Sequence, residues 1–386
     1  MSASLDSRFT RDGSADLECH VARVCEQVRD GVMALIPQER IEGVLLGGGY
    51  GRGEGGVLRV AGSDQAYNDL EFYVLVRGWA PWVERKYRGP LHELGERLSP
   101  AAGLEVEFKV LTRAKLRQSP PSMFYYDLVL GHRWVVGDES LLVACEHHRD
   151  ASRIPLHEAT RLLMNRCSGL LYSAERLARK DFGPAEADFV GRNLAKAQMA
   201  FGDVVLAAHG QYHWSCLERQ RRLAGLGATD GLPLPELRSH HAAGVEFKLH
   251  PMRSLQSREV LLERHVELTG LGQRLWLWLE GRRLGAGVGS DAIDYAFAPT
   301  NLCPETSALR NRLVNARAFG PGVAVVEGGS RYPRERLLRS LAVLLFRPAA
   351  LQGDRSRAAV QCWLRTSAGD FRGLVEAYAG LWSRFN

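Results

Sequence analysis

The segment that most constrains the fold is a glycine-rich stretch in the first sixth of the chain. Seven of the ten residues 47–56 are glycine. Glycine disfavours the interiors of helices and strands, so this stretch predicts a turn. The apolar residues 43–47 run directly into it and predict a short buried strand. A turn of this kind offers backbone N–H groups to anionic oxygens and lets a ligand approach closely.

Two later segments have the alternation of strands and place acids on one face. Residues 69–76 begin with Asp69 and Glu71 and continue with apolar and β-branched residues. Side chains two apart on a strand share a face, so both carboxylates point the same way. Residues 104–111 alternate in the same manner and place Glu105 and Glu107 on one face.

Crowded carboxylates imply a bound cation. Two carboxylates a few ångströms apart repel each other unless a cation lies between them. Hard oxygen ligands suit Mg²⁺, which completes its shell with water and substrate phosphates. A third acid on a neighbouring strand can bridge a second metal ion or take a proton from a hydroxyl group. Either Glu105 or Glu107 can supply this third acid.

These motifs resemble those of a known family. The segment Gly48-Gly49-Tyr50-Gly51-Arg52-Gly53-Glu54 is similar to the Gly-Ser-x-Ala-Arg-Gly-Glu turn of minimal and kanamycin-type nucleotidyltransferases, in the DNA polymerase β-like superfamily. Asn68-Asp69-Leu70-Glu71-Phe72 resembles their Ser-Asp-x-Asp-hydrophobic strand. Val106-Glu107-Phe108 fits their third-acid strand, which favours Glu107 over Glu105. The resemblance covers about residues 43–138.

The resemblance implies a reaction and a set of site residues. The reaction would move a nucleoside monophosphate from a nucleoside triphosphate, ATP first, to a hydroxyl of a small molecule or protein, releasing pyrophosphate. Mg²⁺ or Mn²⁺ would be held by the acids Asp69, Glu71 and Glu107. The phosphates would be bound by residues of the glycine turn: Gly48, Gly49, Arg52 and Gly53.

The order of strands and helices predicts an α/β or α+β core followed by a mostly α-helical domain, and the resemblance implies that this core is an α+β nucleotidyltransferase core. Residues 1–40 are expected to be an N-terminal extension with an amphipathic helix. Residues 41–140 are expected to form the core, with residues 43–138 in one mixed sheet with flanking helices. Residues 150–386 are expected to be α-helical, in one or two parts. Helices are predicted over residues 156–177, 185–209, 235–249, 257–284, 306–319, 333–346 and 358–385.

A second group of cations is expected from the helical domain. The core has few basic residues, whereas Arg192 and Lys196 lie four apart on one face of a predicted helix. We expect them to contact the triphosphate in a cleft between the domains. A solvated basic face is the alternative interpretation of this pair.

Composition limits the partners. The formal net charge is +6, but no block of Lys and Arg marks a nucleic-acid tail, and transfer to RNA ends is disfavoured because the arginines are dispersed. No apolar run approaches the ~18 residues of a membrane span, so a soluble, cytoplasmic protein is expected. The seven cysteines form no C-x-x-C pair. The adjacent pairs His147-His148 and His240-His241 lack the i, i+4 spacing of helical zinc ligands.

A non-catalytic function is the main alternative. A domain of the same fold could bind a nucleotide or a partner protein, as in toxin–antitoxin-like pairs. The three acids argue against this interpretation. Gly49, which stands where the family has serine, argues for it.

Overall fold

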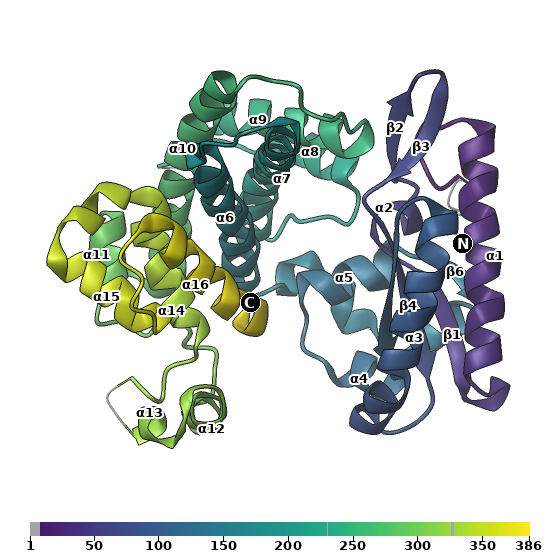
Figure 1. The fold of residues 1–386 in the computed structure, drawn as a ribbon. Helices are drawn as coiled ribbons and strands as arrows, with labels where there is room; N and C mark the ends of the chain where they lie inside the picture. The colour runs from purple at the N-terminus through teal and green to yellow at the C-terminus, as the bar shows by residue number, and fades with distance from the viewer. Residues whose placement is uncertain (1–7, 230, 326–327) are drawn as a thin grey trace. The chain divides into compact units, whose positions relative to one another are not determined.

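The structure is a computed structural model that describes residues 8–229, 231–325 and 328–386. Residues 1–7 of the expected N-terminal extension lie outside the described residues. The chain forms two compact units (Figure 1). Unit 1 comprises Met1–Pro155, His209–Leu226 and Val245–Met252, and unit 2 comprises Leu156–Ala208, Gly227–Gly244 and Arg253–Asn386.

Unit 1 is built on a four-stranded mixed sheet with the strand order β5-β4-β1-β6. Its strands are β1 (Ile41–Leu46), β4 (Asp69–Val76), β5 (Glu105–Leu111) and β6 (Arg133–Val136). β4 pairs in parallel with β5 and antiparallel with β1, which also pairs antiparallel with β6. The general class predicted from the sequence, a small mixed sheet combined with many helices, is therefore confirmed.

Two long helices share one core with the sheet. α1 (Ala15–Leu35) begins at the N-cap Ser14, whose side chain accepts a hydrogen bond from Leu17 N–H, and ends shortly before Pro37. α3 (Ala80–Ala102) ends at a left-handed glycine, Gly103. Both helices belong to the same core as alternate side chains of β4: Leu70, Phe72, Val74 and Val76.

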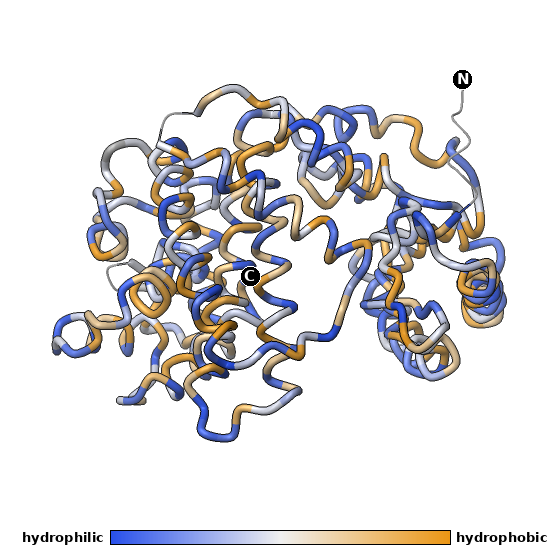
Figure 2. The backbone as a smooth tube through the Cα atoms, turned by 90° about the horizontal axis from the view of Figure 1, so that it is seen from above, coloured by the Kyte–Doolittle hydropathy of each residue, from blue (hydrophilic) through white to orange (hydrophobic). Residues whose placement is uncertain are grey.

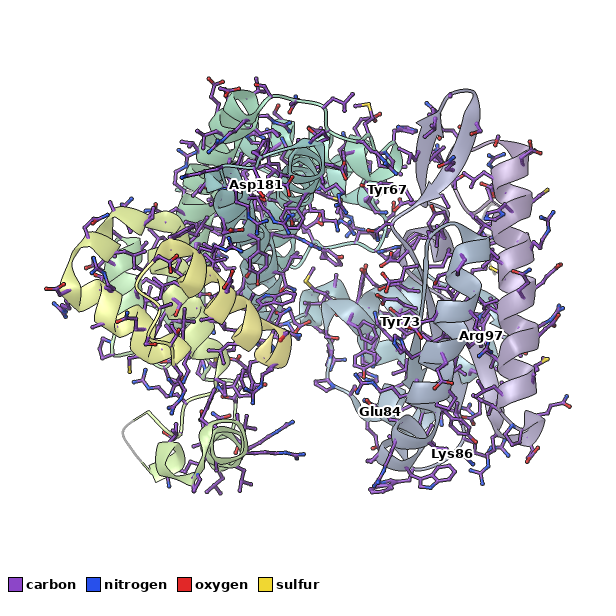
Figure 3. All side chains as sticks on the ribbon, in the orientation of Figure 1. Tyr67, Tyr73, Glu84, Lys86, Arg97 and Asp181 are labelled. Atoms are coloured by element: carbon purple, nitrogen blue, oxygen red, sulfur yellow. The ribbon has the colours of Figure 1, made fainter. Side chains whose placement is uncertain are left out.

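Shorter helices cover part of the opposite face. α4 (Arg113–Gln118) and α5 (Met123–Leu130) contribute to a second core, which includes Tyr73 and Leu75 of β4. Figure 3 labels Tyr73 on this face. The first residues of β4 lie beyond this apolar cover, so the polar start of the strand is left partly accessible.

The glycine-rich stretch contains one helical turn, α2 (Gly48–Gly51). A hydrogen bond from Gly51 N–H to the Gly47 carbonyl (2.9 Å) closes it. Tyr50 is buried, and its hydroxyl donates to the Gly56 carbonyl at 2.7 Å. The prediction that these glycines exclude a helix is wrong for Gly48–Gly51, where burial of Tyr50 accompanies one helical turn despite the cost of glycine in a helix.

The two strands after the turn form a sheet of their own. β2 (Gly56–Val60) pairs antiparallel with β3 (Ser63–Tyr67) and with no strand of the main sheet. The prediction of one mixed sheet across residues 43–138 is wrong for this hairpin. Gly62 and Asn68 have φ values of 86° and 83°, so the chain turns sharply between the hairpin strands and again before β4.

Two segments from the predicted helical region belong to unit 1. His209–Leu226 contains α8 (Cys216–Gly225), and Val245–Met252 contains the end of α9 (Leu234–Leu249). Both segments contact the glycine turn, through the Trp214 carbonyl and through Lys248.

In its described residues, unit 2 contains helices and no strand. Its further helices are α6 (Leu156–Ala178), α7 (Pro184–Ala208), α10 (Arg258–Leu284), α11 (Ala292–Phe297), α12 (Ala308–Phe319), α13 (Pro321–Val325), α14 (Arg334–Leu341), α15 (Asp354–Leu364) and α16 (Phe371–Phe385). A π-helical turn, Ala342–Phe346, continues α14. Short 3₁₀ helices across the chain are Gln38–Arg40, Glu139–Leu142, Glu146–His148, Ala151–Arg153, Ala286–Val288 and Pro348–Gln352.

Hydrophilic and hydrophobic stretches alternate along the helices (Figure 2). Of the helices in the described part of the chain, none combines the length and the apolar character that a membrane crossing requires.

His250 joins the end of α9 to the N-terminal segment. Its Nε2 lies 3.0 Å from both carboxylate oxygens of Asp12, and its Nδ1 lies 2.8 Å from Glu246 Oε1. Burial alone would lower the pKa of His250. The hydrogen bonds to Glu246 and Asp12 outweigh it and raise the pKa above the ordinary 6.5.

We predict that His250→Gln destabilises the protein in a pH-dependent way. A raised histidine pKa contributes stability that is fully present below the unfolded pKa and is lost as pH rises through the folded pKa. The loss in unfolding free energy should reach at most about 1 kcal/mol near pH 6 and should shrink at alkaline pH. Denaturant unfolding across this range measures it, with the exposed His92→Gln as control. A loss independent of pH would contradict the prediction.

Candidate functional site

The start of β4 presents two carboxylates on one face. Asp69 and Glu71 are both half-buried, whereas Leu70 between them is buried in the core on the opposite face. Further along the strand the same face becomes apolar at Tyr73, where α5 covers it. The acids therefore occupy the part of this face that α4 and α5 leave uncovered.

β5 brings the third carboxylate alongside. In the parallel register Glu71 lies opposite Glu107, and Asp69 lies opposite Glu105. One carboxylate oxygen from each of Asp69, Glu71 and Glu107 lies within 4.8 Å of the other two. Glu105 is exposed and is not part of this group. Glu105 and Glu107 were both candidates for the third acid of the site. The structure brings Glu107, and not Glu105, close to Asp69 and Glu71.

Lys109 partly neutralises this acidic cluster. Its ammonium lies 3.0 Å from Glu71 Oε1 and 4.0 Å from Glu107 Oε2. The pKa of Glu107 is nevertheless raised, first by burial and then by the nearby Asp69, Glu105 and Glu71 charges, while Lys109 acts in the opposite direction. The cluster therefore retains an excess of negative charge that a cation would relieve.

The glycine turn lies directly beside the acids. Gly47 N–H donates to the Glu71 carbonyl at 2.8 Å. Gly48 has a φ of 61°, and a Cβ at this position would lie 3.1 Å from Glu71 Oε2. Glycine adopts this backbone conformation and allows this close approach without strain. A small pocket of about 130 Å³ is lined by Gly47, Gly48, Arg52, Glu71, Tyr73, Lys109, Phe124, Asp127 and Leu128.

Arg52 holds the turn to its surroundings. Its guanidinium donates to the Gly48 carbonyl (2.8 Å), to Asp127 Oδ2 (3.0 Å) and to the Trp214 carbonyl (2.9 Å). Asp127 is a residue that the sequence analysis did not identify: it lines the pocket and also accepts a hydrogen bond from the Tyr212 hydroxyl at 3.2 Å. Most of the Arg52 donors are thus used within unit 1.

The end of the turn is anchored by Glu54, which is buried. Its carboxylate accepts hydrogen bonds from the Ser215 hydroxyl and, at 2.9 Å, from Cys216 N–H at the start of α8. Burial raises the pKa of Glu54, but Lys248 and these hydrogen bonds outweigh it and lower the pKa overall. An ionised carboxylate at a helix N-terminus is a favourable arrangement.

Lys248 is a second residue that the motifs did not reveal. Its ammonium donates to the Glu54 carbonyl at 3.0 Å, and a Cβ on Gly49 would lie 3.1 Å from it. Burial lowers the pKa of Lys248. It is 194 positions from Glu54 in sequence, so no local pattern could connect the two. Gly53, with a φ of 74°, completes the turn.

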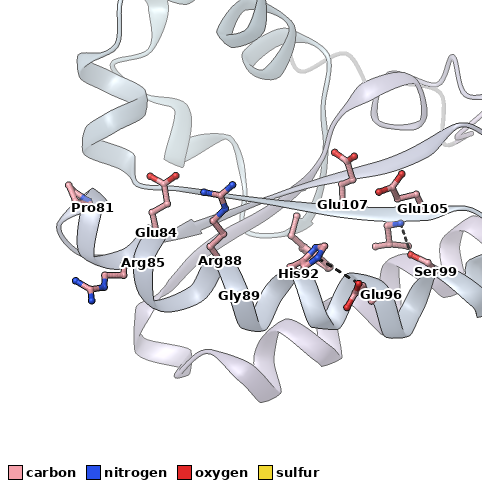
Figure 4. A pocket seen from close by; sticks show the side chains of 12 residues that line it. Pro81, Glu84, Arg85, Arg88, Gly89, His92, Glu96, Ser99, Glu105 and Glu107 are labelled. Carbon is pink, nitrogen blue, oxygen red and sulfur yellow. Dashed lines mark hydrogen bonds and ion pairs between the residues drawn. The ribbon is translucent and has the colours of Figure 1, made fainter. Parts of the chain in front are cut away.

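A larger groove borders the acidic cluster. It has a volume of about 810 Å³ and lies between α3 and β5. Figure 4 shows Glu107 and Glu105 on the strand, with Glu84, Arg88 and His92 along the helix. Glu107 therefore lines this groove and also belongs to the three-acid cluster.

Arg192 and Lys196 lie in unit 2, on α7. Arg192 forms an ion pair with Asp188, one turn earlier in the same helix, with Nε 3.1 Å from Oδ2. The expected contact of Arg192 and Lys196 with a triphosphate stays a prediction.

Comparisons of the chain with protein-family models, with curated proteins and with solved structures return no match.

The donor set of the cluster fits a hard divalent cation. All three ligands are carboxylate oxygens, which suit Mg²⁺ or Mn²⁺. Their mutual distances of up to 4.8 Å allow one ion to contact them all after small side-chain movements. Lys109 would then remain as a second positive charge or rotate toward solvent.

We predict that Glu107→Gln weakens Mn²⁺ binding and, without metal, slightly stabilises the protein. A carboxyl with a raised pKa disfavours folding above its folded pKa and has no effect below its ordinary pKa of 4.5. The gain should stay below about 1 kcal/mol, because Glu107 is partly exposed, and should vanish at acidic pH. Calorimetric Mn²⁺ titration and denaturant unfolding measure the two effects.

The exposed Glu105→Gln is the matched control on the same strand. It should leave Mn²⁺ affinity close to that of the parent. If it reduces affinity as much as Glu107→Gln does, the cluster binds cations only through its general negative charge.

Proposed function

We propose that unit 1 is the catalytic core of a metal-dependent nucleotidyltransferase. Its substrate is a nucleoside triphosphate, ATP first, and its acceptor is a hydroxyl group of a small molecule or a protein. The convergence of Asp69, Glu71 and Glu107 within 4.8 Å, beside a glycine turn, is the observation that carries the proposal. The motif resemblance of residues 43–138 to nucleotidyltransferases adds to it.

The proposed reaction is an in-line displacement at the α-phosphorus. The acceptor oxygen forms a bond to this phosphorus, the bond to the oxygen bridging to the β-phosphate breaks, and pyrophosphate leaves. Glu107 accepts the proton of the acceptor hydroxyl, for which its raised pKa is favourable. A divalent ion held by Asp69 and Glu71 would supply positive charge beside the phosphate oxygens.

The neighbouring groups have positioning roles in this proposal. Gly48, Gly49 and Gly53 let the phosphates approach the backbone, and Arg52 keeps the turn in place through Asp127. The acceptor approaches from the groove between α3 and β5, because Glu107 lines that groove. Its mixture of acidic and basic side chains favours a polar acceptor.

A non-catalytic nucleotide- or partner-binding domain is the second candidate, and one observation favours it. Lys109 lies 3.0 Å from Glu71 and reduces the repulsion in the cluster without a metal ion. A domain that has lost catalysis could retain the acids in this way. Turnover distinguishes the two candidates.

We predict that Asp69→Asn reduces nucleotidyl transfer at least about a hundredfold while the protein remains folded. The substitution removes a metal-binding charge and relieves repulsion, so the melting temperature should stay the same or rise. The assay follows label from each of the four α-³²P nucleoside triphosphates into metabolite and protein pools, with Mg²⁺ or Mn²⁺.

Asp64→Asn is the control for this assay. Asp64 lies on the hairpin strand β3, outside the cluster, so transfer should be unchanged. Full activity in Asp69→Asn would contradict the metal role of Asp69. Nucleotide binding without turnover in the parent would favour the second candidate.

We predict that replacing both Arg192 and Lys196 by Ala raises the KM for the nucleoside triphosphate about tenfold or more. A lost charge-assisted contact is worth about 1.5–3 kcal/mol, and 1.4 kcal/mol corresponds to a factor of ten. Steady-state kinetics measure the effect. Replacing the exposed pair Arg310 and Arg312 of α12 by Ala is the control.

An unchanged KM would assign the pair to a solvated helix face. The cations of unit 1 would then be the source of phosphate contacts. Lys109, which lines the small pocket, would be the first of them to test.

A further inference from the structure

Unit 2 holds a cluster of three potential metal ligands from two helices. Glu236 and His240 lie one helical turn apart on α9, and Glu267 lies on α10. One donor atom from each lies within 4.8 Å of the other two. The i, i+4 spacing places two side chains on one helix face, as in known helical metal sites. The adjacent histidines His240 and His241 lack this spacing, whereas Glu236 and His240 have it.

The His240 ring is held from behind by a buried amide. Gln198 of α7 is only 8% exposed, and its Nε2 lies 3.2 Å from His240 Nδ1. The other ring nitrogen, Nε2, lies 3.2 Å from Glu267 Oε1. A metal-binding histidine uses one nitrogen for the metal and the other for such a fixed partner. A rotated amide would offer its oxygen to a protonated Nδ1, so Gln198 suits either tautomer.

Glu236 is oriented by an arginine. Arg274 of α10 donates to both of its oxygens, at 2.8 and 2.7 Å. A carboxylate has lone pairs to accept these bonds and still coordinate a metal ion. With a neutral His240, the two carboxylates and one guanidinium leave one negative charge in excess. A divalent cation would offset it.

We propose that Glu236, His240 and Glu267 bind Zn²⁺. The imidazole ligand favours zinc over Mg²⁺, which prefers oxygen ligands alone. Glu267 is 55% exposed, so water has access to the remaining coordination position, as in an open site. The bound ion links α9 to α10 within unit 2 and stabilises that unit. This proposal does not depend on the proposed nucleotidyl transfer.

The same contacts also form two ordinary interhelical links, the His240–Glu267 contact and the Arg274–Glu236 ion pair. Direct metal binding separates these two interpretations. The full chain, freed of metal with a chelator, is titrated with Zn²⁺ by calorimetry, and its Co²⁺ form is examined by visible absorption.

The expected result is one Zn²⁺ equivalent whose affinity falls at least about tenfold in His240→Ala and in Glu267→Gln. The Co²⁺ form of the parent should show d–d bands without a thiolate charge-transfer band. At the same zinc concentration, zinc should also raise the melting temperature of the parent more than that of Glu267→Gln.

Two controls isolate the site. His92→Ala disrupts an exposed i, i+4 histidine–glutamate pair on α3, with His92 3.7 Å from Glu96, and should leave this zinc equivalent in place. Glu107→Gln alters the acidic cluster of unit 1 and should also leave it in place.

Three results would overturn the proposal. The first is that the parent binds no zinc, and the second is that both ligand variants bind zinc as the parent does. The third is a Co²⁺ spectrum with thiolate ligation, which would assign the ion to the exposed Cys19 or Cys362. If His240→Ala fails to fold, Glu267→Gln alone decides, because its side chain is half exposed and the substitution preserves its shape.

Discussion

The parallel pairing of β4 with β5 determines where the acids of unit 1 meet. This register sets Glu71 opposite Glu107, and the pleat brings Asp69 to the same face. A shift of one residue would send one set of carboxylates into the apolar core around Leu70 and Phe72. Burial of that core therefore determines the register of the sheet and, with it, the position of the three acids. The free energy gained by burying the core offsets the repulsion among the carboxylates.

The glycine turn has one local anchor, the buried Tyr50, because its glycines contribute little packing of their own. Distant segments supply the rest of its contacts. Arg52 connects the turn to Asp127 and to the Trp214 carbonyl, and Glu54 connects it to the start of α8. Lys248 then binds the Glu54 carbonyl. Unit 1 is completed by segments that follow the first helices of unit 2 in sequence, so the turn depends on a late part of the chain being in place.

Local patterns allowed much of the fold to be predicted. The period-two alternation predicted that Asp69 and Glu71 share a face. The helical periodicity predicted α6, α7 and α10 with ends within one residue of those in the structure. Contacts that depend on tertiary packing were beyond such patterns. Lys248 and Asp127 reach the turn from positions that have no fixed spacing to it. The helical turn at Gly48–Gly51 was missed because burial of Tyr50, which overrides glycine propensity, follows only from packing.

The two clusters of titratable groups differ in a way that bears on cation choice. In unit 1 the candidate ligands are oxygens alone, and the nearby positive charge is the flexible ammonium of Lys109. In unit 2 an imidazole is included, and the nearby positive charge is the planar guanidinium of Arg274. An ammonium on a four-carbon stem can move aside as a hard cation enters, whereas a guanidinium that contacts both carboxylate oxygens remains as an orienting partner. The first arrangement suits an ion that arrives with its substrate, and the second suits an ion that stays with the protein.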